Sequence, residues 1–319
     1  MTRCLVIINP VAGGGKPTRY AMALQWQLST MFDRIEVKFT RQAGDAVLFA
    51  KEATEDGFDA VFCLGGDGTV NETVNGIVKG GGTATFGFVP VGTVNDLARA
   101  LNVPLSPLRA IHMLADAEVI SVDVGRCNDS YFCNNIATGV IPTAVEGVGA
   151  SEKAILGPLA YFMRGGQALL QNQDYEYEID VDGKKIETKS PLVIALMTNC
   201  ISSFEKFMPH AEVNDGFMRI VIFREYFFME ILAIIPLILS GKIYNSKYVS
   251  ILKAKKASIR VKNQTGVVTN MDGSKGPELP ADLEVLPGFL KVFVPKKRPA
   301  KNILSPLYLK NLSFNKIKI

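Results

Sequence analysis

The chain has 319 residues, of which 48% are hydrophobic and 21% are charged, so a disordered or fibrous protein is excluded and about two domains are expected. The 28 glycines and 16 prolines follow no fixed period, which excludes collagen-like and solenoid architectures. The five cysteines are an odd number without paired metal spacing, so we expect neither a disulfide framework nor a zinc module.

The first third of the chain alternates short apolar runs with amphipathic stretches. Runs rich in Val, Ile and Phe and followed by Gly or Pro predict buried strands at Arg3–Ile8, Ile35–Thr40, Phe58–Leu64 and Ala84–Pro90. Helical periodicity lies between them, at Thr18–Met31, Asp45–Glu55 and Val70–Val78. This alternation predicts an α/β domain with a parallel sheet.

Closely spaced apolar runs replace this alternation from about Ser121. They predict strands at Val119–Gly125, Tyr131–Ala137, Tyr175–Asp182, Lys184–Thr188, Leu192–Thr198, Met218–Phe223, Ala257–Lys262 and Phe289–Pro295. Asp182-Gly183 predicts a hairpin turn. Helical stretches interrupt the strands at Leu159–Leu170 and Tyr226–Leu239, so we expect a mostly β domain built as a sandwich or barrel.

No linker rich in Ser, Pro or Gly separates the two halves. We place the boundary near residue 125, which gives an α/β domain over residues 1–125 and a β-rich domain over residues 126–295. A cleft between the two domains is the expected place for a ligand.

The segment Tyr226–Leu239 is the most apolar of the chain, but Glu230 and Pro236 interrupt it. Its longest uncharged run is far shorter than the roughly 20 residues that a membrane-spanning helix needs. We interpret it as a core helix, with a helix lying at a membrane interface as the alternative.

The segment Lys296–Ile319 carries seven basic residues and no acidic residue. It is interpreted either as a solvated tail or as a segment attracted to anionic lipid headgroups. Nucleic acid is not an expected partner, because no basic and aromatic binding module is recognisable elsewhere.

The motif Gly65–Thr69 (GGDGT) follows a predicted strand and precedes a predicted helix. Its glycines allow a sharp turn and close approach to a ligand, and N–H groups at the helix start favour phosphate. Asp67 supplies a hard oxygen ligand suited to Mg²⁺. Thr69 and Glu72 also match a capping box, so a purely structural role stays open for these two residues.

Two further polar loops follow predicted strands of the same sheet. Asn9–Lys16 contains three glycines and a lysine, but it matches neither a Walker A loop nor a dinucleotide fingerprint. Pro90–Arg99 contains Thr93 and Asp96, which alternatively only cap a short helix. Because parallel strands end at one edge of a sheet, the three loops together predict a site for a nucleotide and Mg²⁺.

With these motifs the chain resembles the diacylglycerol kinase catalytic family of soluble bacterial lipid kinases, related to sphingosine kinases and to NAD kinases. The most specific blocks are GGDGTVNE (Gly65–Glu72) and PVGTVND (Pro90–Asp96), and NPVAGGGK, GPLAY (Gly157–Tyr161) and NDGFM (Asn214–Met218) fall in the expected order. The similarity covers nearly the whole chain. It implies an NAD-kinase-like α/β domain, a C-terminal β domain, and a segment 296–319 that packs back on the first domain.

The resemblance also implies a function: ATP- and Mg²⁺-dependent phosphorylation of a lipid hydroxyl, most simply of diacylglycerol to phosphatidic acid in phospholipid biosynthesis. The residues that it places around ATP are Asn9, Pro10, Val11, Ala12, Gly13, Lys16, Thr40, Gly66, Asp67, Gly68, Thr69, Val70, Asn71, Glu72 and Thr93. The resemblance implies that Asp67, Asp96 and Asp215 hold or orient Mg²⁺. It implies a structural Mg²⁺ at Glu212, Asp215 and the backbone of Phe217, and it places the acceptor near Asp123.

One position departs from the family pattern. The family carries Asp-Gly-Glu, whose glutamate is the general base on the acceptor hydroxyl, whereas this chain has Asp272, Gly273 and Ser274. A serine hydroxyl has no useful basicity near neutral pH, and a positioned carboxylate contributes roughly 10²- to 10⁴-fold. Because phosphoryl transfer depends mainly on positioning, Asp272 or a folded-back Glu278 remains a candidate in a slow enzyme.

Two alternatives to an active lipid kinase stay open. In the first alternative, the chain binds nucleotide and lipid without turnover, as a variant lacking its general base would. Alternatively it is an NAD kinase, which shares GGDGT but needs neither PVGTVND nor an apolar C-terminal helix.

The apolar stretch before Asn9 is shorter than that of a signal peptide, so we expect a cytoplasmic protein. A lipid substrate comes from a membrane, and we therefore expect peripheral association with the inner face of an anionic membrane through the basic tail. The sequence leaves open whether the chain forms a homodimer.

Overall fold

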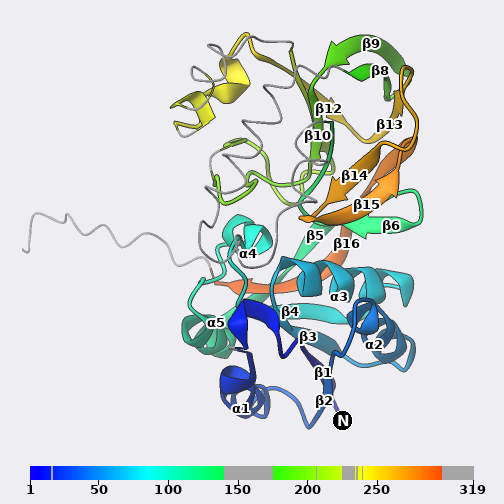
Figure 1. Ribbon diagram of the computed structural model, residues 1–319. Helices are drawn as coiled ribbons and strands as arrows, with labels where there is room; N and C mark the ends of the chain where they lie inside the picture. Colours follow the sequence, from blue (N-terminus) through cyan, green and yellow to red (C-terminus); the bar gives the residue numbers. More distant parts are fainter. Residues whose placement is uncertain are drawn as a thin grey trace, which may run out of the picture.

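The computed structural model describes residues 1–15, 17–139, 175–205, 207–224, 234, 236–238 and 240–296 (Figure 1). Its N-terminal part is an α/β unit around four parallel strands, in the order β2-β1-β3-β4. These strands are β1 (Arg3–Ile8), β2 (Arg34–Phe39), β3 (Ala60–Gly65) and β4 (Thr85–Pro90). Apart from Arg3 and Thr85, every residue of β1, β3 and β4 is buried, as expected where helices cover both faces of a parallel sheet.

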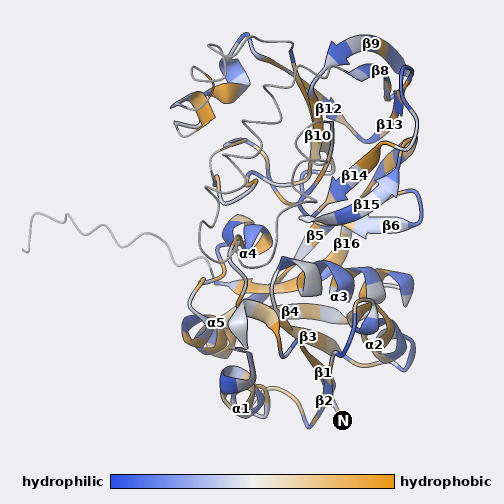
Figure 2. Ribbon diagram, viewed as in Figure 1, coloured by the Kyte–Doolittle hydropathy of each residue, from blue (hydrophilic) through white to orange (hydrophobic). Residues whose placement is uncertain are grey.

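Helices lie on both sides of this sheet (Figure 1). The elements α2 (Asp45–Glu55) and α3 (Asp67–Lys79) pack against each other, and α1 (Pro17–Leu28) packs against α5 (Pro107–Met113). Shorter elements complete the unit: η1 (Ala12–Gly14), α4 (Asp96–Ala100) and η2 (Leu114–Asp116). Figure 2 shows the hydrophobic residues gathered in the strands between the two helical layers.

The C-terminal part is a sandwich of two antiparallel layers. One layer has the order β12-β11-β10-β7-β14-β15. Its strands are β7 (Asn135–Gly139), β10 (Leu192–Leu196), β11 (Met218–Phe223), β12 (Val249–Ala254), β14 (Val268–Met271) and β15 (Ser274–Glu278). The 3-10 helix η3 (Ile243–Asn245) precedes β12.

The second layer continues the sheet of the N-terminal part. Its strands are β5 (Ala117–Cys127), β6 (Ser130–Phe132), β8 (Tyr175–Val181), β9 (Lys184–Ser190), β13 (Lys256–Val261) and β16 (Ala281–Pro295). The long strand β16 pairs with β13 and β5 and reaches β4 through Val292 and Phe86. Buried side chains of both layers form one core, among them Ile220 and Ile136 facing Tyr177, Ile259 and Leu283.

The predicted fold class, an α/β domain followed by a mostly β sandwich, is confirmed. The bounds of β1, α2 and β11 match the predicted ones, and Val181 pairs with Lys184 across the predicted hairpin turn. The single strand expected at Tyr131–Ala137 is wrong, because Cys133 and Asn134 separate β6 from β7. A short helix was expected beside Thr93 and Asp96, and α4 (Asp96–Ala100) lies there, whereas sequence analysis missed α5, β12, β14 and β15.

The division at residue 125 stays a prediction, and two strands bear on it. β5 runs through this position, and the chain returns to the first sheet already within β16, ahead of the segment 297–319. That segment, Lys16, Gly157–Tyr161 and Leu159–Leu170 lie outside the described residues.

Only part of the apolar segment Tyr226–Leu239 is described. Ile234 is 5% exposed, and Leu237 and Ile238 pack against the same apolar cluster, in keeping with a core helix at these positions. No helix among the described residues has the length and apolarity to cross a bilayer.

Candidate functional site

Three glycine-containing loops meet at the carboxyl edge of the parallel sheet, as predicted. A Cβ atom on Gly92 would lie 2.9 Å from the Cα of Gly66, so the loops after β3 and β4 approach each other more closely than side chains allow. Gly13, in the loop after β1, has a φ of +52°, and a Cβ there would collide with the carbonyl oxygen of Val91. The three loops therefore form one continuous backbone surface.

Side chains of the first two motifs join the loops further. The Nδ2 of Asn9 donates a hydrogen bond of 3.1 Å to the Oγ1 of Thr69. The carboxylate of Asp67 accepts the N–H groups of Asn95 and Asp96, each at 3.0 Å. Asp67 thus fixes the loop after β4 against the start of α3.

The capping box considered for Thr69 and Glu72 is wrong. The helix begins at Asp67, its N-cap is Gly66, and no side chain caps it. Glu72 instead accepts the N–H of Gly44, ahead of α2, at 3.1 Å. The first intrahelical bond runs from the N–H of Val70 to Gly66, so the N–H groups of the first turn face the loop edge, where an anion is favoured.

Asp67 is the carboxylate of this edge that keeps acceptor capacity. Burial raises its pKa to about 6, an effect that the nearby Asp96 adds to and the N–H groups of Asn95 and Asp96 oppose. A carboxylate has about four lone-pair sites, and two of them are used here. Asp67 can therefore still take a cation or a proton.

Asp96 lies in a different environment. Its carboxylate accepts the N–H groups of Ser202 and Ser203 at 2.7 Å, the Nδ2 of Asn134 at 3.2 Å and the thiol of Cys200 at 3.3 Å. Asp96 is 8% exposed. Its role as a Mg²⁺ ligand stays a prediction, and in the structure it joins α4 to the β sandwich.

Asp272 is likewise saturated by protein donors. It accepts the N–H groups of Cys133, Asn134 and Asn135 at 2.9, 3.0 and 2.8 Å, and the Nδ2 of Asn71 at 2.9 Å. Burial raises the pKa of Asp272, and these four donors act against the rise. The contacts join α3 to the sandwich and explain why the chain leaves the sheet between β6 and β7.

Asn75, which sequence analysis did not single out, strengthens this junction. Its side chain donates to the carbonyl of Tyr131 at 2.7 Å and accepts the N–H of Tyr131 at 2.9 Å. Asn71 donates to the same carbonyl at 3.1 Å. Two asparagines spaced four residues apart on the same helix were the available signal.

Ser274 opens β15 and lies over the first turn of α3. Its Oγ is 3.8 Å from the position that a Cβ atom would take on Gly68. The place of the expected general base therefore adjoins Asp67. Glu278 is four residues further along the extended strand β15, about 13 Å away at the usual rise, so it is not folded back toward the site.

The remaining predicted ATP contacts differ in exposure. Val11, Gly13, Gly68 and Thr93 are exposed at the loop edge, where a ligand can reach them. Three other predicted contacts, Thr40, Thr69 and Val70, are buried. The predicted roles of all these residues stay predictions.

Asp123, the predicted acceptor residue, and Asp215, in the predicted structural metal loop, are both bound by groups of the protein itself. Asp123 is 2% exposed and accepts the N–H groups of Gly216 and Gly288 at 2.6 and 2.7 Å. Partial burial alone would raise the pKa of Asp215, but the guanidinium of Arg219, which pairs with both its oxygens, and Lys253 lower it.

Glu212 is exposed, and Phe217 accepts a hydrogen bond of 3.0 Å from Arg219 through its carbonyl oxygen. No three Asp, Glu, His or Cys side chains in the described part of the chain gather closely enough to hold a metal ion by themselves. A cation here needs water or a bound ligand to complete its shell.

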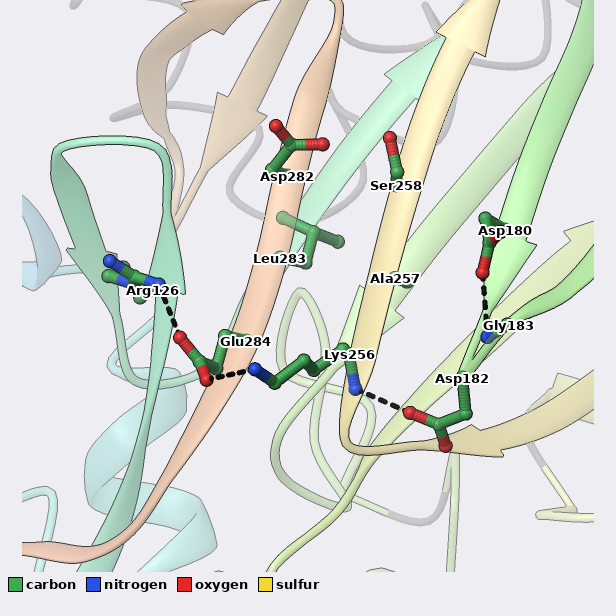
Figure 3. Close-up of a pocket in the computed structure, with 10 residues that line it drawn as sticks. All are labelled: Arg126, Asp180, Asp182, Gly183, Lys256, Ala257, Ser258, Asp282, Leu283 and Glu284. Atoms are coloured by element: carbon green, nitrogen blue, oxygen red, sulfur yellow. Dashed lines mark hydrogen bonds and ion pairs between the residues drawn. The ribbon is translucent and has the colours of Figure 1, made fainter.

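A pocket of about 530 Å³ lies elsewhere, on the sandwich (Figure 3). Three of its charged side chains pair with one another, because Glu284 binds Arg126 and lies 2.9 Å from the Nζ of Lys256. Asp182 accepts the N–H of Lys256 at 2.8 Å. The lining of this pocket contains none of the residues of the three loops, so the pocket is not the site that the motifs define.

The fold combines an α/β domain with a β sandwich, and the three loops meet at the edge of the sheet beside the β14–β15 turn. Residues 3–127 match the sequence model of the diacylglycerol kinase catalytic domain, and residues 134–294 match that of the YegS C-terminal NAD kinase beta sandwich-like domain.

Similar proteins carry the same family name. A diacylglycerol kinase of Staphylococcus epidermidis is 31% identical over 92% of this chain and 92% of that protein. One of Bacillus subtilis is 31% identical over 93% of this chain and 98% of its own. A crystal structure of a diacylglycerol kinase from Bacillus anthracis superposes with a TM-score of 0.76 at 25% identity, covering 92% of this chain and 96% of that one. The chain therefore belongs to the diacylglycerol kinase catalytic family of lipid kinases.

Proposed function

We propose that the chain is an ATP- and Mg²⁺-dependent lipid kinase that phosphorylates diacylglycerol to phosphatidic acid. One observation carries this proposal: three glycine loops, the N-terminus of α3 and Asp67 converge beside the β14–β15 turn of the second domain. Such an arrangement would hold phosphates at the start of α3 and would bring them beside a turn of the second domain, where an acceptor could be positioned. The family membership supports phosphoryl transfer to a lipid over transfer to NAD.

The backbone N–H groups of the three loops would hold the phosphates, and Asp67 would hold Mg²⁺ directly or through water. This fits the usual Mg²⁺ site of kinases, which has one or two carboxylates and completes its octahedron with phosphates and water. Bound Mg²⁺ would neutralise the charge that develops on the transferred group. Asp96 and Asp272 would fix the geometry by clamping the two domains.

Beside Ser274, neither of the two carboxylates named as candidates, Asp272 and Glu278, is placed to take a proton from an acceptor. Ser274 adjoins Gly68, Asp272 has its lone pairs occupied, and Glu278 is remote. Because the transition state of phosphoryl transfer is loose, positioning alone still supports catalysis. We therefore propose a slow enzyme, and Ser274 also favours the second candidate, a protein that binds ATP and lipid without turnover.

The test is transfer of radiolabelled γ-phosphate from ATP, with Mg²⁺, to diacylglycerol in mixed micelles, to a sphingoid base and to NAD. Labelled phosphatidic acid as the main product supports the proposal. Faster labelling of NAD would contradict it, and ATP binding without a labelled product on any acceptor would favour the second candidate.

We further propose that the protein acts at the surface of an anionic membrane, with the basic segment 296–319 as one point of attraction. Removing this segment is expected to weaken binding to anionic vesicles at low salt. Unchanged binding would show that the attraction comes from another surface.

A further inference from the structure

The exposed side of α1 is unusually apolar. Met22 is 81% exposed and Trp26 is 69% exposed, one turn apart on the same face as the exposed Arg19. The opposite side of the helix, with Leu24 and Leu28, is fully buried against the sheet. Surface helices normally place polar residues on the outer face, so the exposed apolar side chains of α1 indicate a surface that binds a partner.

The exposed side of α5 repeats the pattern. Leu105, Leu108, Arg109 and His112 are exposed at the spacing i, i+3, i+4 and i+7, with Leu105 just before the helix. Leu105 is 40% exposed and Leu108 is 53% exposed. Ala110 lies on the inner side and is buried.

These two stripes belong to one surface. The helices α1 and α5 pack against each other and lie on the same side of the sheet, away from α2 and α3 (Figure 1). Met22, Trp26, Leu105 and Leu108 are four of the ten large apolar side chains exposed in the described part of the chain. We name this surface, with Arg19 and Arg109, the α1–α5 face.

The charge of the α1–α5 face decides between its possible occupants. Neither α1 nor residues 101–113 contain an aspartate or a glutamate. The next acidic residues along the chain after α1 and after α5 are engaged: Asp33 accepts the N–H of Thr2 at 2.6 Å, and Asp116 lies 3.8 Å from Lys296. A second copy of the same face, or the basic segment 297–319, would bring like charges together, whereas an anionic surface would not.

We propose that the α1–α5 face docks on an anionic lipid bilayer. Trp26, Met22 and Leu108 enter the boundary between headgroups and acyl chains, and Arg19 and Arg109 contact headgroup phosphates. This inference rests on the proposed function only in that a lipid kinase takes its acceptor from a membrane. The face begins next to the proposed site, because α1 starts at Pro17, directly after the glycine loop Asn9–Lys16.

The chain offers a direct probe, since Trp26 is its single tryptophan. Its emission is recorded while vesicles of phosphatidylglycerol and phosphatidylcholine are added, with and without brominated acyl chains. We expect a shift to shorter wavelength, quenching by the brominated lipid, and little change with phosphatidylcholine alone. Vesicles that sediment with the protein while Trp26 emission stays unchanged would overturn the inference.

Matched variants separate this face from the rest of the surface. Changing Arg19 and Arg109 to Gln is expected to weaken vesicle binding about 25-fold, at about fivefold for each arginine. Leu108→Ser should weaken it as well, whereas Leu48→Ser on α2, where Leu48 is 52% exposed, and Lys79→Gln at the end of α3 should not. Equal losses in both groups would contradict the inference.

Two further readouts identify the other outcomes. A Trp26 shift that follows protein concentration without vesicles would assign the face to a second copy and overturn the docking. Kinase activity on a short-chain diacylglycerol dissolved as a monomer should be unchanged in all these variants. Loss of that activity in every protein, with vesicle docking intact, would refute the proposed function and leave the docking surface standing.

Discussion

Replacing Asp272 by alanine is expected to weaken the junction between the domains. The carboxylate accepts four hydrogen bonds of 2.8 to 3.0 Å, three from the backbone of residues 133–135 and one from Asn71. A buried donor left without an acceptor costs about 1 to 3 kcal/mol, and water entering the small cavity recovers part of this. We expect a loss of about 4 kcal/mol in the free energy of unfolding.

Thermal unfolding measures this loss. A destabilisation of this size should lower the Tm by about 10 °C in a domain of this size. Asp272→Asn keeps one acceptor oxygen and should lie between the wild type and Asp272→Ala. The exposed Asp129→Ala, in the neighbouring β5–β6 turn, serves as the control and should change stability by less than about 0.5 kcal/mol. If Asp272→Ala unfolded at the same temperature as this control, the clamp would be refuted.

Three other predictions follow from the loop edge. Gly92→Ala should force the loops after β3 and β4 apart, because the added Cβ would lie 2.9 Å from the Cα of Gly66. We expect ATP binding to weaken at least tenfold in calorimetric titration. An unchanged affinity for ATP would argue against a phosphate surface shared by the two loops. In the metal-free protein, burial raises the pKa of Asp67 to about 6. Between about pH 4 and pH 6 the folded state therefore keeps a proton on Asp67 that the unfolded chain has already released. The stability that this proton contributes is complete below about pH 4 and is lost as the pH rises through 6. The free energy of unfolding of the wild type should therefore fall between pH 4 and pH 6 relative to that of Asp67→Asn. Parallel pH profiles of the two proteins would show that the pKa of Asp67 is not raised. Ser274→Glu should raise kcat for lipid phosphorylation by about 10²- to 10⁴-fold with little change in the KM for ATP; an unchanged kcat would show that this position does not carry the base.

Much of the fold was predictable because its signals are local. Short apolar runs bounded by Gly and Pro located the parallel strands, and the even burial of β1, β3 and β4 follows from their apolar sequence. The meeting of the three loops was predictable too, since parallel strands bring their carboxyl ends to one edge.

The partners of the polar side chains were not predictable in the same way. Asp96 and Asp272 lie in motifs that suggest chemistry, but their hydrogen bonds reach residues more than one hundred positions away in the chain, which no local pattern specifies. The capping box at Thr69 and Glu72 failed for the same reason, because contacts with Asn9 and Gly44 replaced the local pair. The β14–β15 hairpin had a signal, Asp272-Gly273, whose turn geometry was overlooked because the motif was interpreted as catalytic.

The central claim is that the three glycine loops form the ATP site of a lipid kinase. The most direct measurement is a crystal structure with Mg²⁺ and a non-hydrolysable ATP analogue. The account predicts phosphates against the backbone of residues 11–15 and 66–69, Mg²⁺ bound by Asp67 directly or through water, and the γ-phosphate facing Ser274. A nucleotide bound elsewhere, for example in the pocket between Arg126 and Lys256, or phosphates without contact to these loops, would contradict it.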